Sequence, residues 1–133
     1  KVDTLTHISR MSLADIFLDS FPCNAHTTAS DALQANLPIV TISGKSMSSR
    51  VAGSLLNTLG LNELICSNFD QYVAKVNYLI KNKKKLKKLK VEILEKKSLY
   101  LFNSKLFVTN IEKAYEKIWN HHLNGNKIAD IFI

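Results

Sequence analysis

Three short apolar segments predict the strands of a small sheet. Residues 15–19, DIFLD, form an apolar run that a Ser-Phe-Pro loop ends, a pattern typical of a buried strand. The β-branched run PIVTIS at 38–43 predicts a second strand, which Gly44 ends. ELIC at 63–66 predicts a third.

Helical spacing occupies the two intervals between these strands. Residues 27–36 carry Ala and Leu at helical positions and end before Pro38. Residues 46–59 place three apolar residues on one face and are followed by a terminating Gly60: Val51, Leu55 and Leu59. The order strand, helix, strand, helix, strand predicts an α/β fold with a Rossmann-like parallel sheet and right-handed crossovers.

The remainder of the chain predicts helices only. A helix is expected at 70–80, and residues 81–97 form an amphipathic, lysine-rich segment whose apolar stripe holds Leu79, Leu86, Leu89 and Ile93. Asn103 or Ser104 caps a last helix that reaches about Leu123 and is closed by Asn124-Gly125-Asn126, and four of its residues are expected to face inward: Ile111, Tyr115, Ile118 and Trp119. We therefore expect one partial domain over residues 1–133, with an α/β part at 1–67 and a helical part at 68–133.

The positive charge is local. Residues 81–97 hold nine Lys and two Glu, and so account for the whole net charge of +7. Such a segment can bind nucleic acid through phosphates, but it lacks a series of aromatic residues for base stacking. A solvated helix face is the favoured interpretation, and nucleic acid is not an expected partner.

The sequence carries no signal for a membrane or for secretion. No stretch approaches the ~18 apolar residues of a membrane helix, and the N-terminus has no apolar signal region. Cys23 and Cys66 form no CxxC pair and are expected to be free thiols in a reducing compartment. We expect a cytoplasmic location, and, because the chain does not start with Met, a beginning within a longer protein.

The stretch CNAHTTASD, residues 23–31, is the strongest candidate for chemistry. His26, Thr27 and Thr28 stand where a helix begins after a strand, and unpaired amides at such a position suit phosphate. Asp31 follows one turn later and can accept hydrogen bonds from ribose hydroxyls, so the set suits a nucleotide. The alternative is a capping box, with Thr28 as the cap and Asp31 three residues on.

Other candidates are weaker. His7 and Arg10, three apart on a short helix, have the character of surface residues when taken alone, and His121-His122 suit the end of a helix. ISGKS at 42–46 fails as a phosphate-binding loop because Ile39 stands where the first glycine is needed. The four His and two Cys have no metal-ligand spacing, so no metal is expected.

The segment DIFLDSFPCNAHTTASDALQANLPIVT closely resembles the end of the catalytic region of O-GlcNAc transferases and their SPINDLY-type relatives. The similarity extends from HISRMSLADIFLD through LPIVTISGKSMSSRVAGSLL and LGLNELI, and continues more weakly through FNSKLF and IEKAYEKIWNHHLNGN. These enzymes are sugar-nucleotide glycosyltransferases of GT-B architecture. The resemblance implies that the chain is the C-terminal half of such a fold followed by C-terminal helices, with tetratricopeptide (TPR) repeats upstream.

The resemblance also implies roles by position. His26, Thr27 and Thr28 match residues that receive the donor's diphosphate and stabilise the leaving group, and Asp31 matches the residue that holds the ribose. His7 and Arg10 match contacts at the base pocket. The chain departs from the family at Thr4, where relatives carry a lysine near the nucleotide.

The implied reaction is inverting transfer of GlcNAc from UDP-GlcNAc to Ser or Thr of an acceptor protein, without a metal or other cofactor. The family's other catalytic groups lie upstream of residue 1, so no complete catalytic set is expected in this segment. Two alternatives stay open from the sequence. One is a related donor, GDP-fucose or UDP-glucose; the other is a non-catalytic binding module that uses its lysine-rich helix.

Overall fold

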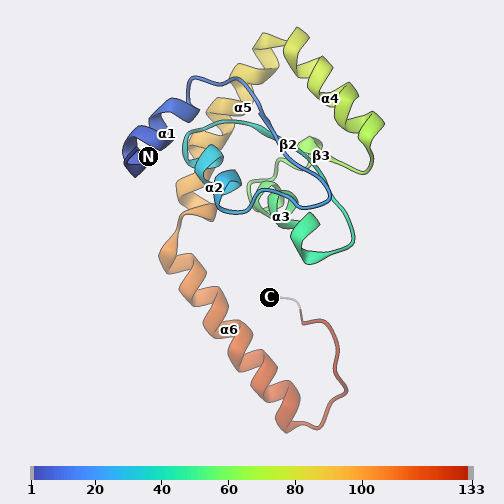
Figure 1. Ribbon diagram of the computed structural model, residues 1–133. Helices are drawn as coiled ribbons and strands as arrows, with labels where there is room; N and C mark the ends of the chain where they lie inside the picture. Colours follow the sequence, from blue (N-terminus) through green and yellow to red (C-terminus); the bar gives the residue numbers. More distant parts are fainter. Residues whose placement is uncertain (1, 132–133) are drawn as a thin grey trace. The chain divides into compact units, whose positions relative to one another are not determined.

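The computed structural model describes residues 2–131, which fall into two compact units divided between Leu101 and Phe102. The first unit contains the whole sheet and five α-helices, and the second contains one long helix and the chain that follows it (Figure 1).

The sheet has three parallel strands, β1 (Phe17–Leu18), β2 (Ile39–Ile42) and β3 (Ile65–Cys66), in the order β1-β2-β3. Phe17 pairs with Ile39 on one side of the central strand, and Thr41 pairs with Ile65 on the other. All four residues of β2 are buried, as a central parallel strand covered on both faces requires. The predicted α/β class and its small parallel sheet are confirmed.

Helices cover both faces of this sheet. α2 (Thr27–Gln34) and α3 (Val51–Thr58) are the two crossovers, and both contact β2. α4 (Phe69–Lys81) contacts β2 as well, and Figure 1 shows it across the strands from α2 and α3. α5 (Lys83–Lys96) follows α4 directly, and α1 (Thr4–Met11) lies against α2.

The apolar stripe predicted in the lysine-rich region is confirmed. Leu79 of α4 and the α5 residues Leu86, Leu89 and Ile93 are all buried in the core that α2, α3 and β2 also form. The helix is not continuous, because Asn82 ends α4 and caps α5 by accepting a hydrogen bond from the Lys85 amide at 3.1 Å.

Two elements are shorter than predicted. Residues 46–59 divide into a 3-10 turn, η1 (Met47–Ser49), and α3, because Arg50 leaves the helical region at φ −124°. Within the predicted strand 15–19 only Phe17 and Leu18 pair; Leu18 is exposed, whereas Asp19 is buried.

A second 3-10 turn, η2 (Asn62–Leu64), precedes β3, and a π-helical turn, η3 (Lys97–Leu101), follows α5.

The second unit contains α6 (Ser104–Leu123). Asn103 caps it, accepting from the Leu106 amide at 3.0 Å, and Asn124 with Gly125 (φ +64°) closes it, as predicted. The expectation of inward-facing residues is wrong: Ile111 is partly exposed, and Tyr115, Ile118 and Trp119 are exposed by half or more. Within the described residues 102–131 this helix has no second helix or strand of its unit to bury them against.

None of the helices within residues 2–131 combines the length and apolar character that crossing a membrane requires.

Candidate functional site

The start of α2 is open at the carboxyl end of the sheet. The first helical bond runs from the Ser30 amide to the His26 carbonyl at 3.1 Å, so the helix itself offers no acceptor to the amides of Thr27, Thr28 and Ala29. His26 is the N-cap, and its side chain makes no capping hydrogen bond. The capping box with Thr28 as cap is therefore wrong, because Thr28 is the second residue of the helix.

The side chains around these amides are accessible. His26, Thr27 and Thr28 are all exposed. The imidazole Nε2 of His26 lies 3.5 Å from the Ser48 carbonyl oxygen, which comes from the loop after β2. The loops that follow two neighbouring strands thus meet at the mouth of α2, where the amides and the helix dipole attract an anion.

Helix α1 brings two further residues predicted for the site, His7 and Arg10, next to α2. Nε2 of His7 lies 3.4 Å from Oδ2 of Asp31, and Nη2 of Arg10 lies 3.1 Å from Nδ1 of His7. Arg10, His7 and Asp31 therefore form one chain of polar contacts, beginning one turn along α2 from Thr27 and Thr28. The structure brings together all six residues predicted for the site.

Asp3 caps the beginning of α1. Its carboxylate accepts from the Thr6 amide at 3.0 Å and from the Thr6 hydroxyl at 2.7 Å. These bonds favour the ionised carboxylate and lower the pKa of Asp3. Thr4, the position at which the resemblance leads us to expect a lysine, is the first residue of this helix.

The loop that presents His26 is held by a buried carboxylate that sequence reasoning missed. Oδ1 of Asp19 accepts from the amides of Ala25 at 2.7 Å and Ser20 at 2.9 Å, and Oδ2 accepts from the Thr41 hydroxyl at 2.6 Å. The Tyr72 hydroxyl of α4 donates to the Asp19 carbonyl at 3.1 Å. Burial, and then the charges of Asp19 and Cys66, raise the pKa of this phenol.

Asn24 ties the same loop to the end of β2. Its Nδ2 donates to the carbonyl oxygens of Ser20 at 3.1 Å and Ile42 at 3.3 Å, and its amide donates to the Ser48 carbonyl at 2.9 Å. Asn24 is buried, and its Oδ1 has no hydrogen-bond partner among the described residues. The loop is thus bonded at both ends, and His26 follows it directly.

The partner loop after β2 depends on a glycine. A Cβ on Gly44 would collide with the Oγ of Ser49 and come within 2.8 Å of its Cβ. Ser49 is buried, and it accepts a hydrogen bond from the Ser46 hydroxyl at 2.9 Å. Gly44 therefore permits the tight turn that aims the Ser48 carbonyl at His26.

A sequence signal existed for Asp19 and not for Tyr72. An acid at the end of a buried apolar run needs partners, and this could have pointed to Asp19. Tyr72 reaches the loop from a helix 53 residues away, at a spacing that no local pattern reveals.

No group of His, Cys, Asp or Glu within residues 2–131 is arranged to hold a metal ion. His121 and His122 do not pair: Nε2 of His121 lies 2.7 Å from the Lys127 carbonyl oxygen, and the ring of His122 lies beside Trp119. That the site works without a metal stays a prediction. The start of α2 offers hydrogen-bond donors to an anion.

Comparison with known proteins identifies the family. The model of glycosyl transferase family 41 matches residues 3–111. A probable UDP-N-acetylglucosamine–peptide N-acetylglucosaminyltransferase, SEC of Arabidopsis thaliana, is 39% identical over 123 residues, which are 91% of this chain and 13% of that protein. The SPINDLY protein of Solanum lycopersicum, named as the same kind of probable transferase, is 34% identical over 121 residues, 90% of this chain and 13% of that protein.

A solved structure agrees. An O-GlcNAc transferase mutant from Thermobaculum terrenum matches with a TM-score of 0.82 at 26% identity, over 89% of this chain and 23% of that one. The chain thus spans about 13% of the length of the two curated relatives. Because the family model covers most of its residues, the chain belongs to glycosyl transferase family 41.

Proposed function

We propose that the chain is the C-terminal nucleotide-sugar-binding portion of a protein O-glycosyltransferase that transfers GlcNAc from UDP-GlcNAc to Ser or Thr hydroxyls. The relatives named above carry UDP-N-acetylglucosamine–peptide transferase names, which supports the donor and the acceptor class. The observation that carries the proposal is the open start of α2 with the His7–Asp31 contact beside it.

The diphosphate binds at the mouth of α2. The amides of Thr27, Thr28 and Ala29 and the hydroxyls of the two threonines are donors on one exposed helix end. Their partial positive charge complements a diphosphate, and His26 adds a ring nitrogen. Asp19 and Asn24 hold these donors in place before the ligand arrives.

The nucleoside extends from the diphosphate toward α1. Asp31 lies one turn along α2 and accepts hydrogen bonds from the ribose hydroxyls. His7 and Arg10, which follow Asp31 in the polar chain, lie at the base. The order of the side chains thus reproduces the order diphosphate, ribose and base.

The proposed reaction needs this charge distribution. The acceptor hydroxyl attacks the anomeric carbon from the face opposite the leaving group, its proton passes to a base outside this chain, and the bond from the sugar to the β-phosphate oxygen breaks. Negative charge grows on UDP, where His26 and the α2 amides stabilise it without a metal. Donors fixed beforehand favour the transition state because they need no reorganisation during the reaction.

The chain acts as part of a larger enzyme in this proposal. It supplies one side of the donor cleft, and an N-terminal catalytic half, with TPR repeats before it, supplies the remaining catalytic groups in the cytoplasm. The chain alone is then inactive.

Calorimetry with UDP on the complete protein tests the site. A His26→Ala, Thr27→Ala double variant loses one or two hydrogen bonds to a charged ligand, about 1.5–3 kcal/mol each, and should bind UDP at least ~10-fold more weakly. The matched control is His122→Ala, Thr58→Ala, which removes the same residue types outside the site. Equal UDP affinity in all three proteins would refute the assignment.

Competition identifies the donor. UDP-GlcNAc should displace bound UDP more effectively than UDP-glucose or GDP-fucose at equal concentration. Preferential displacement by either of the other two would keep the diphosphate site and reassign the sugar or the base.

A further inference from the structure

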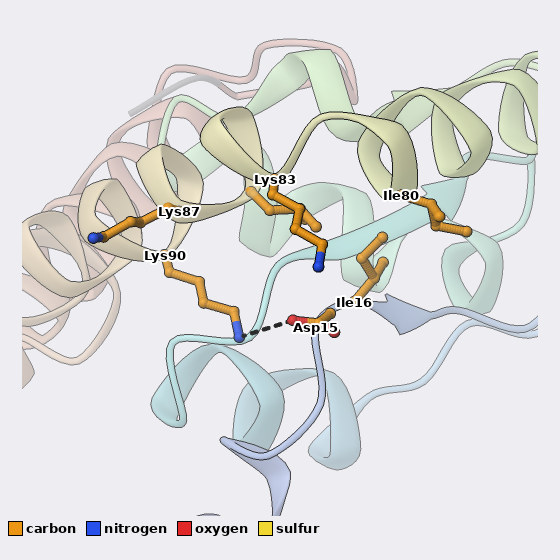
Figure 2. Close-up of a pocket in the computed structure, with 7 residues that line it drawn as sticks. Asp15, Ile16, Ile80, Lys83, Lys87 and Lys90 are labelled. Atoms are coloured by element: carbon orange, nitrogen blue, oxygen red, sulfur yellow. Dashed lines mark ion pairs between the residues drawn. The ribbon is translucent and has the colours of Figure 1, made fainter.

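A pocket of about 320 Å³ lies at the opposite end of the sheet from the proposed donor site. Asp15 and Ile16, which line it, immediately precede β1, whereas the donor site follows the carboxyl ends of the strands. The other lining residues come from the end of α4 and the first two turns of α5 (Figure 2).

The pocket has apolar walls and a cationic rim. Ile16, Ile80 and Leu86 supply apolar surface, and Lys83, Lys87 and Lys90 border it. Ile80 is 58% exposed although it is a large aliphatic side chain. The volume of the pocket falls within the range of pockets that bind small molecules or peptide side chains.

The lysines of the rim differ in their contacts. Lys90 donates to the Ala14 carbonyl at 2.8 Å and lies 3.9 Å from Oδ1 of Asp15, so it compensates the single acid of the pocket. Lys83 and Lys87 make no hydrogen bond or ion pair with any described residue. Figure 2 shows Lys83 and Lys90 reaching toward Asp15, while Lys87 extends away along the helix.

The uncompensated charge continues beyond the rim. Three other lysines of this region have partners. Lys85 pairs with Glu63, and Lys96 pairs with Glu92 and donates to the Leu59 carbonyl. Lys97 donates to the Gln34 carbonyl. Five lysines of the same region have no partner within residues 2–131: Lys81, Lys83, Lys84, Lys87 and Lys88. Lys83 to Lys88 alone span about 8 Å along α5 at helical rise, and Lys81 ends α4, so the five extend over more than a single small anion covers.

We propose that this pocket and the five free lysines bind an acidic peptide segment of a partner protein, with one apolar side chain of that segment seated between Ile16 and Ile80. Carboxylates on both sides of the apolar anchor pair with the lysines, which supplies charge complementarity over the length of the segment. The pocket lining holds no aromatic ring on which a nucleic-acid base could stack, which favours a peptide over RNA.

The test is fluorescence anisotropy of the complete protein with a fluorescein-labelled peptide in which glutamates flank a central Leu-Phe pair. Binding should weaken at least tenfold between low and high salt, because the contacts are ionic. A peptide with Gln in place of every Glu, and one with Gly-Gly in place of Leu-Phe, should each bind at least fivefold more weakly.

Matched variants separate the pocket from charge alone. Lys83→Gln, Lys87→Gln should reduce affinity at least fivefold, whereas Lys105→Gln, Lys113→Gln removes the same charge from α6 and should have no effect. Ile80→Ser should reduce affinity, whereas Val91→Ser, at a 46% exposed apolar position of α5 outside the pocket, should not.

Three outcomes overturn the proposal. One is equal loss in the two lysine pairs, which indicates unspecific attraction. Another is unchanged affinity in Ile80→Ser, which would show that the peptide does not bind in the pocket. The third is tighter binding of polyuridine or of phosphatidylserine vesicles with the same Lys83 and Lys87 dependence, which assigns the surface to RNA or to a membrane. UDP binding is measured on the same variants and should stay unchanged, so failure here leaves the donor site unaffected.

Discussion

Asp19 and Thr41 share a 2.6 Å hydrogen bond between side chains that lie 22 residues apart in the sequence. Asp19 follows β1 directly and Thr41 lies within β2, so the bond joins the loop that presents His26 to the central strand. Both residues are buried, and the other carboxylate oxygen of Asp19 holds two amides of the loop. The start of α2 is therefore positioned by the core of the sheet.

Asp19→Asn should loosen this loop. An amide keeps the side-chain volume but presents one acceptor oxygen where the carboxylate presents two, and each lost bond to a charged group costs about 1.5–3 kcal/mol. Hydrogen exchange should then speed up at the amides of Ser20 and Ala25. Thr41→Val removes the hydroxyl alone and should give a smaller increase, while exchange rates equal to wild type in Asp19→Asn would disprove the role.

Sequence patterns predicted the features that depend on residues close together in the chain, such as helix faces and helix ends. The apolar stripe through Leu86, Leu89 and Ile93 follows from helical period, and Gly125 at φ +64° follows from the need to end a helix. The loops that follow the strands depend instead on tertiary contacts, which a short stretch of sequence does not reveal. Examples are the hydrogen bond from Tyr72 to Asp19 and the packing of Ser49 against Gly44.

The residues of the proposed donor site were expected from the motif and the resemblance, whereas one of their contacts was not. His26, Thr27 and Thr28 at a helix start were inferred from the sequence, but the contact of His7 with Asp31 arises because α1 lies against α2. Trp119 shows the opposite case. Its helical spacing predicted burial, but the described part of its unit holds no second helix or strand that could cover the ring.

Two glycines should respond to alanine in opposite directions. At Gly44 the new Cβ would overlap Ser49 and approach a ring carbon of Phe21 at 3.3 Å, and such overpacking costs about 1–3 kcal/mol. At Gly53, inside α3, the nearest atom is a methyl of Ile65 at 3.7 Å, so alanine should stabilise by up to about 1 kcal/mol through helix propensity. Urea unfolding of the two variants beside wild type measures this, and a stabilising Gly44→Ala would contradict the packing argument.

The two thiols should differ in reactivity. Cys23 is exposed, whereas Cys66 in β3 is 3% exposed and its burial raises the pKa of the thiol. Because the thiolate is the reacting form, Ellman's reagent at neutral pH should modify one thiol per chain rapidly and the second only in urea. Cys23→Ser should abolish the rapid phase; a rapid phase that survives this change would show that Cys66 is accessible.

Stability should fall as the pH rises through the alkaline range. Burial raises the pKa of Cys66 above its ordinary 9.0 and that of Tyr72 above its ordinary 10.0, so the folded state holds both protons more tightly than the unfolded state. Their contributions are complete below about pH 8, under both ordinary values, and are lost as the pH rises through the raised pKa values of the folded state. Burial lowers the pKa of Lys97, which acts in the opposite sense, since only the unfolded state then retains that proton.

Urea unfolding at a series of pH values from 8 to 10.5 separates these groups. Tyr72→Phe should make the decline with pH shallower, although it also removes the hydrogen bond to Asp19 and lowers stability at every pH. Lys97→Met should make the decline steeper. Parallel pH profiles for wild type and both variants would contradict the assignment of the alkaline loss to these side chains.

Asp31→Asn should separate nucleoside binding from diphosphate binding. In the proposed donor site Asp31 holds the ribose and orients His7 through the 3.4 Å contact between Oδ2 and Nε2, but it lies one turn away from the amides that receive phosphate. Removing its charge therefore weakens UDP by about 10-fold or more, the value of a lost hydrogen bond to a charged group, and leaves inorganic pyrophosphate unaffected. The His26→Ala, Thr27→Ala variant, in contrast, weakens both ligands. Calorimetry of the two ligands on the two variants gives four affinities, and a pyrophosphate affinity that falls in Asp31→Asn as much as UDP does would show that this carboxylate supports the mouth of α2 itself and not the ribose.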